Sequence, residues 1–330
     1  MTVLRDAMSA KGVAAGTRRS TPRAKLGSRR RLTVLAFMSP AIVGFSLFFI
    51  YPLIATIYFS FHRYDLLSAP EFVGFRNYDY FLHDDPQVWQ AIHNTLWLVV
   101  VLVPARIMFA LVVSQILVTI KRGAGLLRAL YYLPALAPPV AATLMFVFLF
   151  NPATGPVNKA LSLLHIDGPL WFNDANWAKP GLALLGLWGV GDVMIIIVAA
   201  MLNVPRELYE AASLDGANGF KQWRHITIPT IAPVLMFATI TGVIAMLQYF
   251  TQAAVAAQAA AGQATVGGGV GALLGYPLGS TLTFPQWLYV QGFVNYYLGY
   301  ASVLALVLFV AALLFVLVLL HQFRDTIKAR

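Results

Sequence analysis

Six blocks of apolar residues, each long enough to cross a membrane, are the strongest constraint on how this 330-residue chain can fold. A hydrocarbon core of ~30 Å is crossed by about 20 apolar residues in helical conformation. With 59% hydrophobic and 11% charged residues, the chain is too apolar for an ordinary soluble domain. The sequence therefore predicts an all-α polytopic membrane protein with six transmembrane helices, at about residues 33–61, 94–119, 129–150, 181–202, 230–250 and 299–320.

The basic residues predict the orientation of these helices, because cytoplasmic loops of membrane proteins are enriched in Lys and Arg. Nine precede residue 32, and three lie in each of 121–128, 205–229 and the C-terminal end, against four in the loops of the opposite side. Both termini and the loop at 205–229 are therefore predicted to be cytoplasmic. Residues 1–31 show no apolar periodicity, which predicts a disordered basic cytoplasmic tail ahead of a transmembrane domain at 32–330.

Charge and cysteine content exclude several other classes of protein. The net charge of +10 comes mostly from the N-terminal tail, so nucleic-acid binding is not expected. Because the chain has no cysteine, it forms no disulfide and no thiolate metal site, which is compatible with a bacterial membrane protein.

A polar stretch, PRELYEAASLDGANGFKQWRHITIP at 205–229, separates the fourth and fifth apolar blocks. Pro205 suits a first helical turn, and Glu207 and Glu210 lie near the positive end of the resulting helix dipole. Turn-forming residues then predict a bend before the helix resumes at 220–228, and Pro229 marks a further break or a helix entry. The composition of residues 205–229 alone also suits an ordinary cytoplasmic loop between membrane helices.

The spacing within this stretch resembles a known signature. Glu210-Ala211-Ala212, three residues, Gly216, nine residues and Ile226-Thr227-Ile228-Pro229 resemble the EAA motif of the membrane subunits of ABC importers, with Ile228 where Leu is usual. The segment ELYEAASLDGA is similar to the carbohydrate branch, the maltose-type permeases. The resemblance implies a coupling helix that docks into a cleft of a separate ATPase subunit. The residues implied in this coupling are Glu207, Glu210, Ala211, Ala212, Asp215, Gly216, Ala217, Ile226 and Pro229.

The resemblance extends to other parts of the chain after residue 32. FVGFRNY at 72–78 resembles an FVGLxNY segment, and 128–158 resembles the third helix of these permeases, although Phe146 replaces a usual Trp. TVGGG at 265–269 only partly matches a TxGGP-like segment. Pro138-Pro139 is expected to bend the third helix beside a cavity or a partner. The small residues of 253–275 are expected to pack against a second membrane subunit or line the pore mouth.

Polar side chains inside the predicted spans are the candidate solute contacts. A charge at mid-bilayer costs at least ~2.5 kcal/mol, so Arg106 and Asp192, at similar depths, either form a structural ion pair or line a translocation path. On a path, Arg donates to sugar hydroxyls and Asp accepts from them. Gln248, Tyr249 and Gln252 are candidate contacts to a polyol, or else a helix cap with an interfacial Tyr. Asn94 and Thr95 are expected to cap the second helix.

The sequence lacks G-x-x-x-x-G-K-[ST], so this chain is not expected to be the ATPase. No cluster of residues with catalytic spacing predicts an enzyme, and no cofactor is expected on this chain. The resemblance implies a multi-pass subunit of the bacterial plasma membrane in contact with lipid, which transports a sugar or related polyol. It also implies partners, namely a second homologous permease, an ATP-binding cassette ATPase dimer that uses ATP and Mg, and an extracytoplasmic solute-binding protein.

Two alternatives remain open from the residues alone. The first is a self-contained secondary transporter or channel driven by an ion gradient, although no internal repeat relates 33–150 to 181–320. The second is a membrane scaffold that recruits an ATPase without transporting a solute.

Overall fold

The computed structural model describes residues 28–262 and 273–328, and within these ranges the chain is mainly helical. The chain divides into two units, residues 1–53 and 54–330. The first unit contains α1 (Ser28–Phe45) and a π-helical segment (Ser46–Ile50), and α2 (Tyr51–Ser60) begins at its end. The predicted tail at 1–27 lies outside the described residues.

The second unit contains one short hairpin and the remaining helices. Strands β1 (His62–Arg63) and β2 (Glu71–Phe72) pair antiparallel, with His62 opposite Phe72. The helices that follow are α3 (Arg76–Asp79), α4 (Pro86–Trp97), α5 (Val103–Thr119), α6 (Ala124–Tyr132), α7 (Pro139–Leu149), α8 (Pro156–Leu163), α9 (Ala178–Trp188), α10 (Gly191–Leu202), α11 (Arg206–Leu214), α12 (Gly219–Gln222), α13 (Ile228–Leu247), α14 (Thr251–Ala260), α15 (Phe284–Tyr289) and α16 (Leu298–Lys328).

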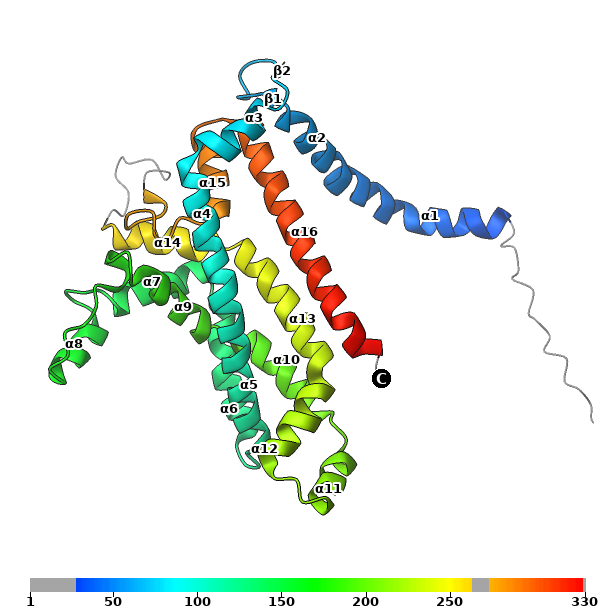
Figure 1. The fold of residues 1–330 in the computed structure, drawn as a ribbon, viewed down its shortest axis with the longest axis vertical. Helices are drawn as coiled ribbons and strands as arrows, with labels where there is room; N and C mark the ends of the chain where they lie inside the picture. The colour runs from blue at the N-terminus through cyan, green and yellow to red at the C-terminus, as the bar shows by residue number, and fades with distance from the viewer. Residues whose placement is uncertain (1–27, 263–272, 329–330) are drawn as a thin grey trace, which may run out of the picture. The chain divides into compact units, whose positions relative to one another are not determined.

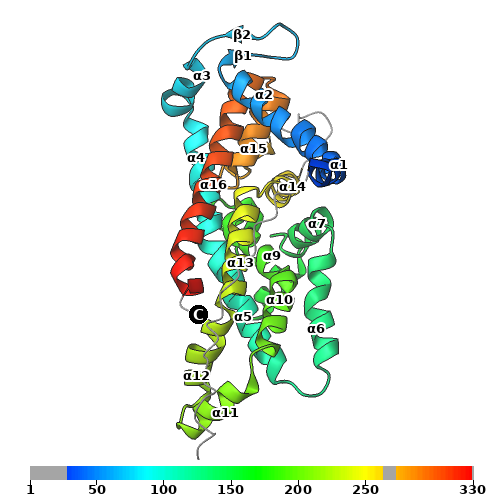
Figure 2. The same cartoon turned by 90° about the vertical axis from the view of Figure 1, so that its right-hand side faces the viewer.

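Shorter segments extend or join these helices. Within the described residues, π-helical segments lie at Tyr80–Asp84, Leu98–Leu102, Trp223–Thr227 and Val290–Val294, and 3₁₀ segments include Leu133–Leu136 and Trp171–Asn173. In Figures 1 and 2, the β1–β2 hairpin and α11 lie at opposite ends of the unit. The hairpin and residues 205–229 (the coupling stretch) therefore lie on opposite sides of any membrane that the long helices cross.

Among the residues that the structure describes, four helical stretches are long and apolar enough to cross a membrane, and up to six if each of two bent helix pairs counts as one span. The four are Leu32–Ser60, Pro86–Thr119, Gly219–Leu247 and Leu298–Gln322. The bent pairs are Ala124–Leu136 with Pro139–Leu149, bent by 96°, and Ala178–Trp188 with Gly191–Leu202, bent by 45°. Each of the six overlaps one of the predicted apolar blocks, and the expected bend at Pro138-Pro139 is confirmed. The prediction of one continuous helix at 181–202 is wrong, because the chain breaks at Gly189-Val190.

The second span begins earlier than predicted. Its N-cap is Asp85, whose Oδ1 accepts from the backbone N–H groups of Gln87 and Val88, so Asn94 is not a cap. Asn94 instead lies inside α4, where its Nδ2 donates to the carbonyls of Gly279 and Leu282. The other oxygen of Asp85 accepts from Trp287 Nε1 at 2.7 Å and Tyr300 Oη at 2.5 Å. This buried carboxylate thus ties α4 to α15 and α16 near the hairpin end.

One hydrophobic core of the second unit lies in the half that carries the coupling stretch, where the helices pack closely. Ala110 and Ser114 of α5 are fully buried against α10, and Ser114 Oγ donates to the carbonyl of Met194 at 3.1 Å. Small side chains let two helix backbones approach in this way. Nearby apolar residues of α5, α10 and α13 complete this core, including Val113, Leu117, Ile197, Val198 and Ile231.

The alanine-rich segment after α13 packs within its own chain. Ala253, Ala254, Ala256 and Ala257 of α14 are buried, and α14 packs against α7. These small residues make a helix contact within the chain, and the expectation that 253–275 packs on a second subunit or lines the pore mouth stays a prediction. Residues 263–272, which include the TVGGG segment, lie outside the described residues.

Candidate solute pocket and coupling stretch

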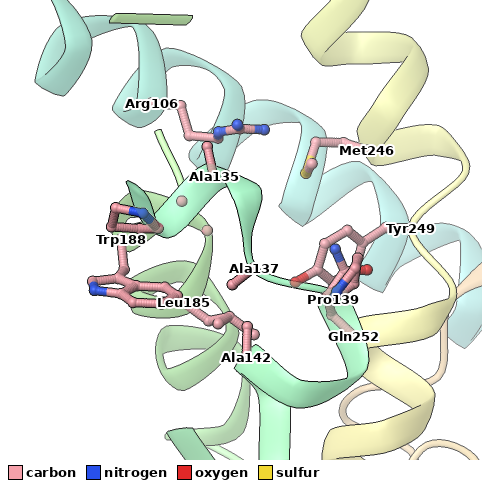
Figure 3. Close-up of a pocket in the computed structure, with 13 residues that line it drawn as sticks. Arg106, Ala135, Ala137, Pro139, Ala142, Leu185, Trp188, Met246, Tyr249 and Gln252 are labelled. Carbon is pink, nitrogen blue, oxygen red and sulfur yellow. The ribbon is translucent and has the colours of Figure 1, made fainter. Parts of the chain in front are cut away.

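A pocket of about 150 Å³ lies where the two bent spans break. The break at Ala137-Pro138 separates the 3₁₀ segment Leu133–Leu136 from α7, and the break at Gly189-Val190 separates α9 from α10. Side chains of α5, α13 and α14 complete the wall (Figure 3). The lining residues are Arg106, Pro134, Ala135, Ala137, Pro139, Ala142, Leu185, Gly186, Trp188, Gly189, Met246, Tyr249 and Gln252.

Backbone contact joins the two bent spans near their breaks. A Cβ atom on Gly191, the first residue of α10, would lie 2.5 Å from the carbonyl oxygen of Tyr131 and 2.8 Å from Cα of Tyr132. Such distances leave no room for a side chain, so glycine is required there for space. The start of α10 and the end of α6 therefore lie in direct contact, which fixes the two bent spans beside the pocket.

Arg106 and Asp192, the two ionisable residues of the predicted spans, are joined in the structure. Arg106 Nη2 donates to Asp192 Oδ1 at 3.1 Å and links α5 to α10. The Arg106 side chain is only 17% exposed, whereas that of Asp192 is 59% exposed. Arg106 Nε is buried without a hydrogen-bond partner among the described residues. Of the two, Arg106 lines the pocket and Asp192 does not.

The polar residues predicted around the end of the fifth span have different positions. Tyr249 and Gln252 line the pocket, and Figure 3 shows them across it from Arg106. Tyr249 is 5% exposed, and its buried hydroxyl has no partner in the described part of the chain. Gln248 is exposed and does not line this pocket, because it follows the last turn of α13 on a different side from Tyr249. The structure thus brings together three of the five predicted path residues, with Asp192 bound to one of them.

Several lining residues carry no polar signal and were missed from the sequence. Trp188 and Gly189 lie at the second break, where two glycines, Gly189 and Gly191, flank a single valine in an apolar run. That glycine pair was the available signal, since each glycine within a helical pattern costs about 1 kcal/mol relative to alanine. The prolines of the first break were predicted to border a cavity, and Pro139 does line the pocket.

The coupling stretch at 205–229 has the predicted helix–bend–helix form. Pro205 is the N-cap of α11, and Gly216 has a φ of +76°, the left-handed region that only glycine adopts readily. Asn218 caps α12 by accepting from the N–H of Lys221 at 2.9 Å. The helix then continues from Gly219 to Leu247, so Pro229 lies within a continuous helical span, at the start of α13.

Most residues of the implied EAA contact are exposed. Glu207, Glu210, Ala211, Asp215, Gly216 and Pro229 are exposed, and Ala212, Ala217 and Ile226 are half-buried. Two large apolar side chains at the tip are also exposed, Leu214 at 91% and Phe220 at 67%. An exposed apolar tip with charged neighbours has the character of a protein-docking surface.

Hydrogen bonds brace the base of this stretch. Tyr209 Oη lies 2.8 Å from Thr227 Oγ1 and joins α11 to the start of the fifth span. Gln222 Nε2 donates to Ser213 Oγ and to the carbonyl of Ala217, which closes the bend around Gly216. These hydrogen bonds connect α11 and the bend to the helix that contains α13.

Known proteins with similar sequence and fold identify the family. Residues 107–326 match the family described as binding-protein-dependent transport system inner membrane component. A probable ABC transporter permease protein, YesP of Bacillus subtilis (strain 168), is 33% identical over 286 residues, covering 86% of this chain and 88% of the relative. The sulfoquinovosyl glycerol transport system permease SmoG of Agrobacterium fabrum is 31% identical, covering 84% and 86%. The chain therefore belongs to this family of inner-membrane transport components.

A solved structure shows the same fold. It is a chain of a bacterial alginate ABC transporter, crystallised in complex with an alginate pentasaccharide-bound periplasmic protein. The TM-score is 0.73 at 22% identity, and the alignment covers 90% of this chain and 96% of the other. The helices of this chain are thus arranged as in that chain of the alginate ABC transporter.

Proposed function

We propose that this chain is a permease subunit of an ATP-driven ABC importer that moves a sugar or sugar-like solute into a bacterial cell. Family membership supports the role in transport, and the carbohydrate class rests on relatives whose names specify sugar solutes. The observation that carries the assignment is the geometry of the coupling stretch, a braced short helix with an exposed apolar tip at the end opposite the hairpin.

In this proposal α11 docks on a separate ATPase subunit. Glu207 and Glu210 make polar contacts, Ala211 and Ala212 permit close approach, and Gly216 provides the bend. Closure of an ATPase dimer, with ATP and Mg bound there and not on this chain, moves α11. The Tyr209–Thr227 contact passes that movement to the fifth span.

The pocket between the bent spans is proposed as this subunit's half of the solute path. Small-molecule sites usually measure about 300–1,000 Å³, so a pocket of about 150 Å³ suits a half-site that a second, homologous permease completes. Broken helices at membrane depth typically line such cavities. An extracytoplasmic solute-binding protein would deliver the solute at the hairpin end.

Co-purification with an ATPase tests the proposal. The chain is expressed with its neighbouring permease and ATP-binding subunit, and Gly216→Pro is compared with Gly74→Pro. Both glycines have positive φ, +76° and +61°, and a Cβ would meet nothing within 4 Å at either, but Gly74 lies beside the hairpin. The wild type and Gly74→Pro are expected to retain the ATPase in detergent, and Gly216→Pro to lose it while still inserted. A wild type that retains no ATPase would favour a gradient-driven transporter.

A further inference from the structure

Each polar side chain that lines the pocket between the bent spans can donate hydrogen bonds. Arg106 contributes a guanidinium, which has five N–H donors and no acceptor. Tyr249 contributes a hydroxyl whose donor capacity is unused by any described residue, and Gln252 an amide. The described lining contains no Asp or Glu. A site of this composition favours a ligand rich in acceptors.

The backbone adds positive potential to the same wall. Helix α7 has 11 residues and begins at Pro139, which lines the pocket together with Ala142 one turn later. Pro139 has no N–H, and the N–H of Ala142 donates to the carbonyl of Pro138 at 3.0 Å, so this helix start contributes the positive end of its dipole and no free donor from the lining residues. Because the chain breaks just before Pro139, this helix end lies at the pocket wall.

The ion pair with Asp192 leaves part of the Arg106 guanidinium without a hydrogen-bond partner. Asp192 is 59% exposed, engages Arg106 through Nη2 and lies outside the lining, while Arg106 Nε remains buried and unpartnered. A carboxylate that binds one edge of a guanidinium orients the group and leaves its other N–H donors for a ligand. Asp192 thus acts as a positioning residue for Arg106.

We propose that the pocket binds the anionic group of an acidic sugar, such as the carboxylate of a uronate. This proposal rests on the proposed function and specifies the charge of the solute. Arg106 and the start of α7 attract the anion, and Tyr249 donates a hydrogen bond to it. A neutral sugar would leave the guanidinium Nε and the tyrosine hydroxyl less well satisfied, and therefore binds more weakly.

The test measures binding of matched sugars to the assembled complex in lipid nanodiscs. The complex contains this chain, its neighbouring permease and the ATPase. The probes are galacturonate against galactose, and glucuronate against glucose, titrated by calorimetry. At least one uronate is expected to bind tenfold or more tightly than its neutral partner. Arg106→Gln is expected to remove most of that preference, and Tyr249→Phe to reduce uronate affinity several-fold.

Asp192→Asn separates a solute site from a structural ion pair. It frees the Arg106 charge, so uronate affinity is expected to rise, whereas a purely structural pair would give a less stable complex with no gain in affinity. Circular dichroism and size-exclusion profiles of each variant report whether the complex remains assembled.

The outcomes for the two proposals are distinct. A wild-type complex that retains its ATPase but binds neither uronate more tightly than its neutral partner, or binds no probe, overturns the charge assignment alone. A wild type that retains no ATPase overturns the proposed function, and this inference with it. Equal loss of neutral and acidic sugar binding in Arg106→Gln also contradicts the charge assignment.

Discussion

The pocket and the coupling stretch both interrupt the helical spans, and both depend on a glycine, but for different reasons. Gly191 beside the pocket has no room for a Cβ, because the backbone of Tyr131 lies 2.5 Å from where it would be. Gly216 in the coupling stretch has open space around it and a φ of +76°. One glycine permits contact between two distant segments, and the other permits a local turn.

The two regions therefore differ in whether distant or neighbouring residues determine their structure. The pocket lies between two spans whose packing depends on contact between residues about 60 positions apart, Tyr131 and Gly191. The coupling stretch is locally encoded, braced at its base and exposed at its tip.

Gly191→Ala is expected to have the largest effect on stability. The added methyl group would overlap a backbone carbonyl that cannot rotate away, and overpacking of this kind costs about 1–3 kcal/mol or more. The matched control is Gly125→Ala in α6, where nothing lies within 4 Å and alanine is favoured in a helix by roughly 1 kcal/mol. Thermal unfolding of the purified complex measures both. Equal melting temperatures for the two variants would contradict the close contact.

Gly216→Ala is expected to have a smaller effect on stability, with a specific loss of coupling. An L-residue in the left-handed region costs roughly 1–2 kcal/mol, with no steric overlap here. Gly219→Ala is the control, since Gly219 is also open but lacks a positive φ. Solute-stimulated ATP hydrolysis is the readout, and Gly216→Ala is expected to lower it while Gly219→Ala leaves it near wild type. If both variants lowered solute-stimulated ATP hydrolysis, coupling would depend on the whole surface of the stretch and not on the bend at Gly216.

The same contrast explains what could be predicted from the sequence. The coupling stretch was predictable because its determinants are local, with Pro205 at the helix start and Gly216 at the bend. The apolar blocks likewise marked the spans, since hydropathy needs no knowledge of partners. The pocket was only partly predictable. Arg106, Tyr249 and Gln252 were candidates on polarity alone.

What the sequence could not reveal was contact between distant segments. The break at Gly189-Val190 sits in an apolar run that reads as one helix, and its meaning depends on the end of α6 packing beside Gly191. Asn94 was expected to be a cap because a polar residue before an apolar run usually is one. Its true partners, the carbonyls of Gly279 and Leu282, lie more than 180 residues away.

Tyr209→Phe tests the base of the coupling stretch and is expected to cost about 1 kcal/mol, the usual value of one hydrogen bond. The change leaves the buried Thr227 hydroxyl without its partner at 2.8 Å. A double-mutant cycle with Thr227→Val isolates the pairwise energy. Additive losses in the unfolding free energy would show that the two hydroxyls do not interact.

Tyr249→Phe, in the pocket, is expected to have the smallest effect on stability. The Tyr249 hydroxyl is buried and has no partner among the described residues, so its removal loses no hydrogen bond. The unfolding free energy should stay within about 0.5 kcal/mol of wild type, or rise, because an unsatisfied buried donor is destabilising. Thermal unfolding beside Tyr209→Phe compares a paired with an unpaired tyrosine in one fold. A loss above about 1 kcal/mol for Tyr249→Phe would mean that the hydroxyl is already satisfied, and it would then have no free donor to offer a solute.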